Sequence, residues 1–259
     1  MKKHIILFFL LTLTVFGGVI KTPILSIDAS EQTVRIKIKK IDVGISGFVV
    51  HRLGKYNSII LKDLTVVNYD KDTQIATLKM KDFDQLVQNS LPTGKWKVEV
   101  GDIAILAFGY SRALLIAPNE ETYYRITKAT KQIQWIHPDL FATILSFNGH
   151  PTPLKEDFNK MSISTSAGLV FFYLNQKLFT VDAKSMVILN ITKAVLKQDS
   201  LKLPFYSRID KIDSSWYDWF DEGAEELEEY EEYYYSLLLD SNPNNEELKQ
   251  AYVQYQNKR

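Results

Sequence analysis

The chain has 259 residues, a mass of 29.9 kDa and a hydrophobic content of 46%, enough to bury a core in one large domain or two small ones. Lysine and arginine number 31, and so do aspartate and glutamate, so no bulk positive charge points to nucleic acid as a partner. There is no cysteine, which excludes disulfides, thiolate metal ligands and a cysteine nucleophile.

The N-terminus has the pattern of a secretory leader. Met1-Lys2-Lys3-His4 is basic, residues 5–16 are almost entirely apolar, and Gly17-Gly18 follows. The apolar run is shorter than the roughly 20 residues of a membrane-spanning helix. We therefore predict a signal peptide over residues 1–17, export, and a mature chain without a transmembrane span. The alternative is an uncleaved anchor that reaches to Leu25.

The next part of the chain is rich in short strand patterns. Residues 33–41 alternate between apolar and basic side chains, which is typical of a half-buried strand. We interpret its basic face (Arg35, Lys37, Lys39, Lys40) as the solvated side of an edge strand, with a ligand-facing stripe as the alternative. A short helix is expected over Phe83–Leu91. Further strands are expected at residues 48–50, 59–68, 74–80, 96–100, 103–108 and 113–117, which together predict a small antiparallel barrel or sandwich over residues 33–117. The strand at 113–117 could belong either to this unit or to the one that follows.

After Pro118 the pattern changes to a mixture of helices and strands. Asn119 is a good N-cap for the first helix, and Gly149 ends the second. Asn175-Gln176 is a two-residue connection, which predicts a hairpin. Helices are expected at residues 120–130, 140–147 and 154–161 and strands at 133–136, 168–174, 177–182 and 186–191, so residues 118–210 are predicted to form a mixed α/β domain within an α+β protein.

The last part of the chain is acidic and rich in tyrosine. Residues 211–259 carry thirteen acids against four bases, and residues 1–210 carry twenty-seven bases against eighteen acids. We predict a helical tail over residues 214–259 with one buried stripe that includes Leu227, Tyr230, Tyr234 and Leu237, a break at Asn242-Pro243 and a last helix at 246–256. Two alternatives remain: a helix that binds an envelope protein partner, and a divalent-ion site, although a calcium loop is absent. Residues 233–235 could form an interface or ordinary core.

Motifs for catalysis are missing from the sequence. It contains no nucleophile elbow, no S-x-x-K, no H-E-x-x-H and no P-loop. His51, His137 and His150 are scattered, and we expect each of them to be a solvent-exposed loop residue. We therefore predict a protein that is not an enzyme, with no catalytic residue, no metal site and no cofactor.

One known family resembles this chain. The resemblance lies in residues 114–145 (LLIAPNEETYYRITKATKQIQWIHPDLFATIL), and other segments follow in the expected order: Gly44–Val50, Val98–Leu106, Gly168–Asp182 and Pro204–Asp210. These residues resemble the N-terminal domain of the plasminogen-binding surface proteins (Pgb type) of host-associated epsilon-class proteobacteria. The resemblance implies a noncatalytic exported protein at the cell surface, associated with the outer membrane or in the periplasm, that recruits host plasminogen.

The resemblance also suggests how plasminogen would attach. Plasminogen kringles bind lysine side chains, best of all a C-terminal lysine, and the family members that give it its name carry a long lysine-rich tail. Here the tail is short and acidic and ends in Asn257-Lys258-Arg259. The candidate plasminogen-binding residues are therefore Lys258 and Arg259. The alternative is exposed lysines elsewhere in the chain, called body lysines below. A different function, as a structural or assembly component of the periplasm or outer membrane, is suggested by the tyrosine-rich acidic tail.

Overall fold

The computed structural model describes residues 18–83, 96–196, 200–214 and 223–257. The predicted signal peptide, all of the predicted helix 83–91 beyond Phe83, and the candidates Lys258 and Arg259 lie outside the described residues. No helix in the described ranges combines the length and the hydropathy needed to cross a lipid bilayer.

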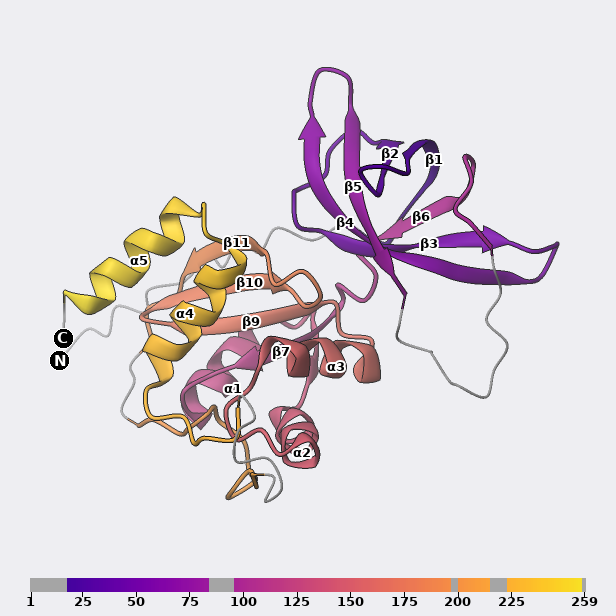
Figure 1. Ribbon diagram of the computed structural model, residues 1–259. Helices are drawn as coiled ribbons and strands as arrows, with labels where there is room; N and C mark the ends of the chain where they lie inside the picture. The colour runs from indigo at the N-terminus through magenta and orange to yellow at the C-terminus, as the bar shows by residue number, and fades with distance from the viewer. Residues whose placement is uncertain (1–17, 84–95, 197–199, 215–222, 258–259) are drawn as a thin grey trace.

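Six antiparallel strands close into a barrel, which forms one lobe of the molecule (Figure 1). Its interior is filled by alternate side chains of the strands, including Val34, Ile36, Leu64 and Leu106, all of them buried. The expected antiparallel barrel is confirmed, and β1, which the sequence did not lead us to expect, completes it. The strands are β1 (Ile20–Asp28), β2 (Thr33–Lys37), β3 (Ser46–Arg52), β4 (Ser58–Asp70), β5 (Ile75–Asp82) and β6 (Ile103–Leu106), in the order β1-β2-β5-β4-β3-β6.

Two predictions about the barrel are wrong. Residues 96–100 form no strand, because the Asp102 carboxylate accepts the backbone N–H of Glu99 at 2.8 Å and folds this segment into a turn. In addition, β2 is not an edge strand, because it pairs with β1 on one side and β5 on the other. Arg35 and Lys37 are exposed on the outside of a closed barrel, which has no edge to protect.

The second unit is a five-stranded mixed sheet with helices on both faces. One face, with Leu115 and Phe171, packs against α1, and the other face, with Leu114 and Phe172, packs against the remaining helices. The expected mixed unit and the hairpin at Asn175-Gln176 are confirmed. Its elements are β7 (Arg112–Ile116), α1 (Glu120–Ala129), β8 (Gln134–Ile136), α2 (Pro138–Asn148), α3 (Lys155–Thr165), β9 (Leu169–Leu174), β10 (Lys177–Asp182) and β11 (Ile188–Lys193), with strand order β11-β10-β9-β7-β8.

The C-terminal helices are part of the second core. α4 (Tyr230–Ser241) and α5 (Glu246–Gln256) form the expected helical pair, and α4 lies across the sheet (Figure 1). The ring of Tyr234 lies 5.5 Å from that of Phe172, and both are fully buried. Tyr235 is also buried, so these two tyrosines belong to the core rather than to an exposed interface. Burial raises the pKa of Tyr234 well above its ordinary value.

The start of α2 is tied to a distant loop by Asp139. Its carboxylate accepts the backbone N–H and the Nε–H of Arg208, each at 2.7 Å. Burial raises the pKa of Asp139, but the two hydrogen bonds and the positive charge of Arg208 outweigh it, so the pKa lies below its ordinary value. The stabilisation by the ionised carboxylate is thus complete above the unfolded-state pKa and is lost as the pH falls through the folded-state pKa.

Replacing Asp139 with asparagine should therefore lower the free energy of unfolding at pH 7 by roughly 1 kcal/mol. The difference from the wild type should begin to shrink below about pH 4, where the unfolded chain starts to bind this proton, and should disappear only below the lowered folded-state pKa. Urea unfolding at pH 7 and pH 3 tests this, with Asp240→Asn on the exposed side of α4 as the matched control. An equal difference at both pH values would contradict the role of the charge.

Candidate functional site

A buried carboxylate joins the barrel to the second unit. Asp182 lies at the end of β10, is fully buried, and accepts the backbone N–H of Ser46 at 3.0 Å and its hydroxyl at 2.7 Å. The Tyr110 hydroxyl donates to the same oxygen at 2.6 Å, and the backbone N–H groups of Lys184 and Ser185 donate to the other. Burial, followed by the charge of Asp182, raises the pKa of Tyr110, which keeps this hydroxyl a donor.

Further contacts surround this carboxylate. The ammonium of Lys184 lies 2.6 Å from a carboxylate oxygen of Asp63 on β4, and the Ser185 hydroxyl donates to the Gly44 carbonyl at 2.7 Å. Gly44 has a φ of +95°, and a Cβ there would lie only 2.3 Å from a methyl carbon of Val187. Only glycine combines this left-handed φ with the room that the Val187 side chain needs, so the relative position of barrel and sheet is tightly specified.

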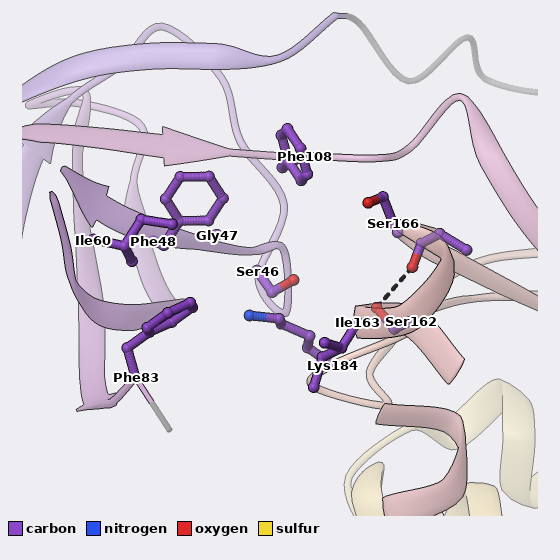
Figure 2. A pocket seen from close by; sticks show the side chains of 12 residues that line it. Ser46, Gly47, Phe48, Ile60, Phe83, Phe108, Ser162, Ile163, Ser166 and Lys184 are labelled. Carbon is purple, nitrogen blue, oxygen red and sulfur yellow. Dashed lines mark hydrogen bonds between the residues drawn. The ribbon is translucent and has the colours of Figure 1, made fainter. Parts of the chain in front are cut away.

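A cleft of about 180 Å³ opens beside this junction (Figure 2). The barrel contributes three apolar side chains, Phe48, Ile60 and Phe83, and the β6–β7 connection contributes Phe108, whose ring packs edge-on against Phe48 at 5.4 Å. The opposite wall is the last turn of α3 and the residues after it, with Ile163 and the hydroxyls of Ser162 and Ser166. Lys184 extends between the two walls.

This cleft has general features of a ligand-binding site. It is concave and mostly apolar, lies between two structural units and contains a few convergent polar groups. The sequence did not suggest it. Phe48, Phe108 and Lys184 lie far apart in the chain, and each reads as an ordinary strand or turn residue until the tertiary contacts bring them together.

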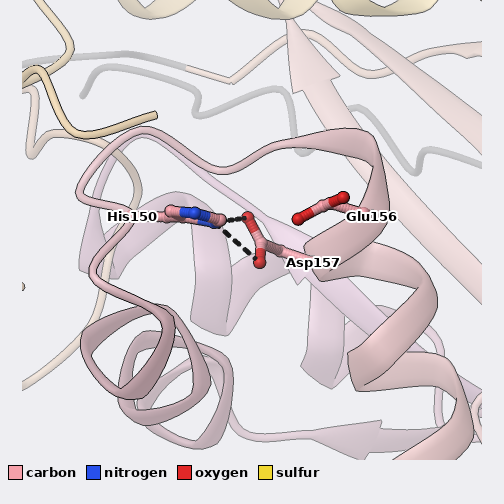
Figure 3. A group of neighbouring side chains, drawn as sticks. All are labelled: His150, Glu156 and Asp157. Carbon is pink, nitrogen blue, oxygen red and sulfur yellow. Dashed lines mark hydrogen bonds and ion pairs between the residues drawn. The ribbon is translucent and has the colours of Figure 1, made fainter. Parts of the chain in front are cut away.

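His150 is not solvent-exposed, contrary to our expectation. It is only 5% exposed, and its Nδ1 lies 2.9 and 3.0 Å from the two carboxylate oxygens of Asp157 (Figure 3). Glu156 lies next to them, close enough for the three residues to offer atoms to one metal ion. However, the Asp157 carboxylate also accepts N–H groups of Asn148 and Leu154, at 2.7 and 2.9 Å. These hydrogen bonds anchor the start of α3.

His51 and His137, the other two histidines in the described ranges, also have structural partners. The Nδ1 of His51 lies 2.7 Å from the Asp102 carboxylate, and His137 is the N-cap of α2, where its Nδ1 accepts the backbone N–H of Asp139. Both side chains are only partly exposed. The three histidines lie at separate places in the fold and do not form one catalytic group.

Several body lysines that could serve as plasminogen-binding residues are exposed. Lys37 on β2 and Lys79 on β5 project from the outside of the barrel, and Lys55 lies at the tip of the β3–β4 hairpin, with its ammonium 5.2 Å from the ring centre of Tyr56. Such side chains are accessible to a partner that binds extended lysines.

Comparison with known proteins gives a consistent assignment. The family model described as plasminogen-binding protein pgbA N-terminal matches residues 19–238. Two curated relatives, both named plasminogen-binding protein PgbA and from Helicobacter pylori strains J99 and 26695, are each 29% identical over 192 residues, or 73% of this chain. The chain spans about two fifths of the length of these relatives, 41% and 40% respectively. No solved structure matches the chain.

The matched range runs from the start of β1 through almost all of α4, and so includes the barrel, the whole mixed sheet and the cleft between them. The resemblance noted in the sequence is thus confirmed over a wider range than the quoted segments. This protein belongs to the family of PgbA N-terminal domains.

Proposed function

We propose that this chain is a noncatalytic, exported binding protein that recruits host plasminogen. The proposal is supported above all by the family match over residues 19–238 and by the name of the two relatives. The basic start of the chain and the apolar run that follows support export. The cleft and the exposed lysines are consistent with binding rather than catalysis.

The proposed attachment uses lysine or arginine side chains of this chain. A kringle that binds lysine pairs an acidic group with the ammonium and holds the aliphatic stem against aromatic rings. Lys258 and Arg259 would offer two adjacent cations, and the lysines on the barrel exterior would each offer a single cation. We place the main contact at Lys258 and Arg259.

Plasminogen binding to the purified chain tests this proposal. Immobilised protein should bind plasminogen saturably, and 6-aminohexanoate should abolish the binding because it competes for the kringle site. The double variant Lys258→Gln/Arg259→Gln should weaken binding about tenfold, the effect of losing one charge-assisted contact. The matched control Arg35→Gln/Lys37→Gln, on the outside of the barrel, should leave the affinity unchanged.

Each other outcome is informative. If the barrel variant weakens binding and the terminal variant does not, the body lysines are the attachment site. If wild-type protein fails to bind plasminogen at micromolar concentration, or if excess 6-aminohexanoate has no effect, lysine-mediated recruitment is wrong for this chain.

A second candidate function is a structural or assembly role in the bacterial envelope. The observation that favours it is the charge of the C-terminal region: residues 223–257 carry nine acids and a single lysine, and several of the acids, among them Glu225 and Glu228, are exposed. Such a surface suits a basic partner protein. Crosslinking in the native cell, followed by identification of the crosslinked proteins, separates this role from plasminogen recruitment.

A further inference from the structure

We propose that the cleft between the barrel and α3 binds a small aromatic carboxylate, with its ring among the phenylalanine side chains and its carboxylate on the Lys184 ammonium. This site is separate from the residues proposed to contact plasminogen, and the proposal does not depend on them.

The size of the cleft limits its occupant. A dry cavity of about 150 Å³ accommodates one benzene ring, and the cleft here has about 180 Å³. It therefore has room for one ring with a short substituent. Phe48, Phe83 and Phe108 offer aromatic surfaces, and aromatic pairs favour offset or edge-to-face contacts with a further ring.

The Lys184 ammonium determines the charge of the ligand group that lies beside it. The Lys184 ammonium has three N–H donors and lies 6.0 Å from the ring centre of Phe83, so it stands beside the position of a bound ring. One donor is directed at Asp63, which leaves others for a ligand carboxylate. The second nearby carboxylate, Asp182, is buried and already accepts five hydrogen bonds from Ser46, Tyr110, Lys184 and Ser185.

The charge of Asp63 is the main opposing factor. Its carboxylate neutralises part of the charge of Lys184 and therefore weakens the attraction for an anion. This leads to an unusual expectation: removal of the negative charge at residue 63 should strengthen binding, whereas removal of the positive charge at Lys184 should weaken it. A site that simply collects apolar molecules would respond to neither change in this way.

Titration with 3-phenylpropionate and its neutral analogue 3-phenylpropanol tests the proposal. Amide shifts in two-dimensional NMR spectra of the full chain would report both the affinity and the location. The acid should bind with a dissociation constant on the order of 1 mM and about fivefold more tightly than the alcohol. The signals that move should come from residues around Phe108, Ser166 and Lys184.

Three variants and one control separate the contributions. Lys184→Met should remove the preference for the acid, Asp63→Asn should increase the affinity for the acid by about threefold or more, and Phe108→Ala should weaken both ligands about fivefold. Phe108 is 49% exposed, so its truncation does not threaten folding. The control Lys249→Met removes another lysine that is paired with a carboxylate, on α5, and should change nothing.

The proposal is overturned by any of three results: equal binding of acid and alcohol to the wild type, an unchanged preference in a folded Lys184→Met variant, or shifts that map outside the cleft. The dispersion of the NMR spectrum shows whether each variant is folded.

Discussion

Replacement of Asp182 with alanine should lower the free energy of unfolding by about 3–5 kcal/mol, because this fully buried carboxylate is the acceptor for five donors at the junction of the two units. Without it, the backbone N–H groups of Ser46, Lys184 and Ser185 lose their acceptor, and the space that the carboxylate leaves is itself fully buried. Each such loss costs about 1–3 kcal/mol, and partial rearrangement reduces the sum.

Guanidinium unfolding at neutral pH, followed by circular dichroism and by tryptophan fluorescence, measures this loss. Tyr110→Phe removes one of the five donors and keeps the ring, so it should cost only about 1 kcal/mol. Asp240→Ala, on the exposed side of α4, is the matched control and should stay within about 0.5 kcal/mol of the wild type. A loss of less than 1 kcal/mol for Asp182→Ala would show that the junction is held by apolar contacts instead.

Local patterns predicted most of the elements, for physical reasons that are clear from particular residues. The alternation of residues 33–41 predicted a strand, and β2 covers its first part, Thr33–Lys37. Asn119 caps α1 as expected, and Gly149 in the left-handed conformation ends α2. In each case the signal is contained within a few residues of the chain, where a strand period or a cap can be recognised directly.

The failures have a common cause, namely contacts over long sequence separations. β1 contains Pro23 and begins soon after the apolar run of residues 5–16, so no simple alternation identifies it, and only pairing with β2 and β6 makes it a strand. Residues 96–100 alternate well but are held in a turn by Asp102. The cleft could not be predicted either, because its walls come from Phe48 and Ser166, which are 118 positions apart.

For the acidic tail, too, the sequence predicted the local structure but not the tertiary contacts. The helical spacing of Tyr230 and Tyr234 correctly indicated a buried stripe, and the break near Asn242 was also expected. The sequence left open what the stripe would pack against. The structure gives the answer: the Tyr230 hydroxyl donates to the carbonyls of Ile116 and Tyr173 on β7 and β9, so this helix completes the core of the sheet.

Truncation of Tyr234 to alanine should therefore lower the free energy of unfolding by about 3–5 kcal/mol, the usual cost of deleting a fully buried aromatic ring. Its ring packs against Phe172 and Tyr230, and its hydroxyl donates to the Pro204 carbonyl at 2.9 Å. Tyr234→Phe should lose only the hydrogen bond, about 1 kcal/mol. Tyr56→Ala, which removes a ring that is 86% exposed, is the control and should have almost no effect.

The same denaturation measurement decides how the C-terminal region can be studied. If Tyr234→Ala is as costly as expected, deletion of α4 and α5 uncovers the apolar face of the sheet, and loss of a partner after such a deletion reports unfolding. A partner of the acidic surface must then be tested with substitutions of exposed acids, such as Glu225→Gln and Glu228→Gln, which leave the buried tyrosines in place. A small effect of Tyr234→Ala would instead mean that the helices are dispensable, and deletion would be the simpler experiment.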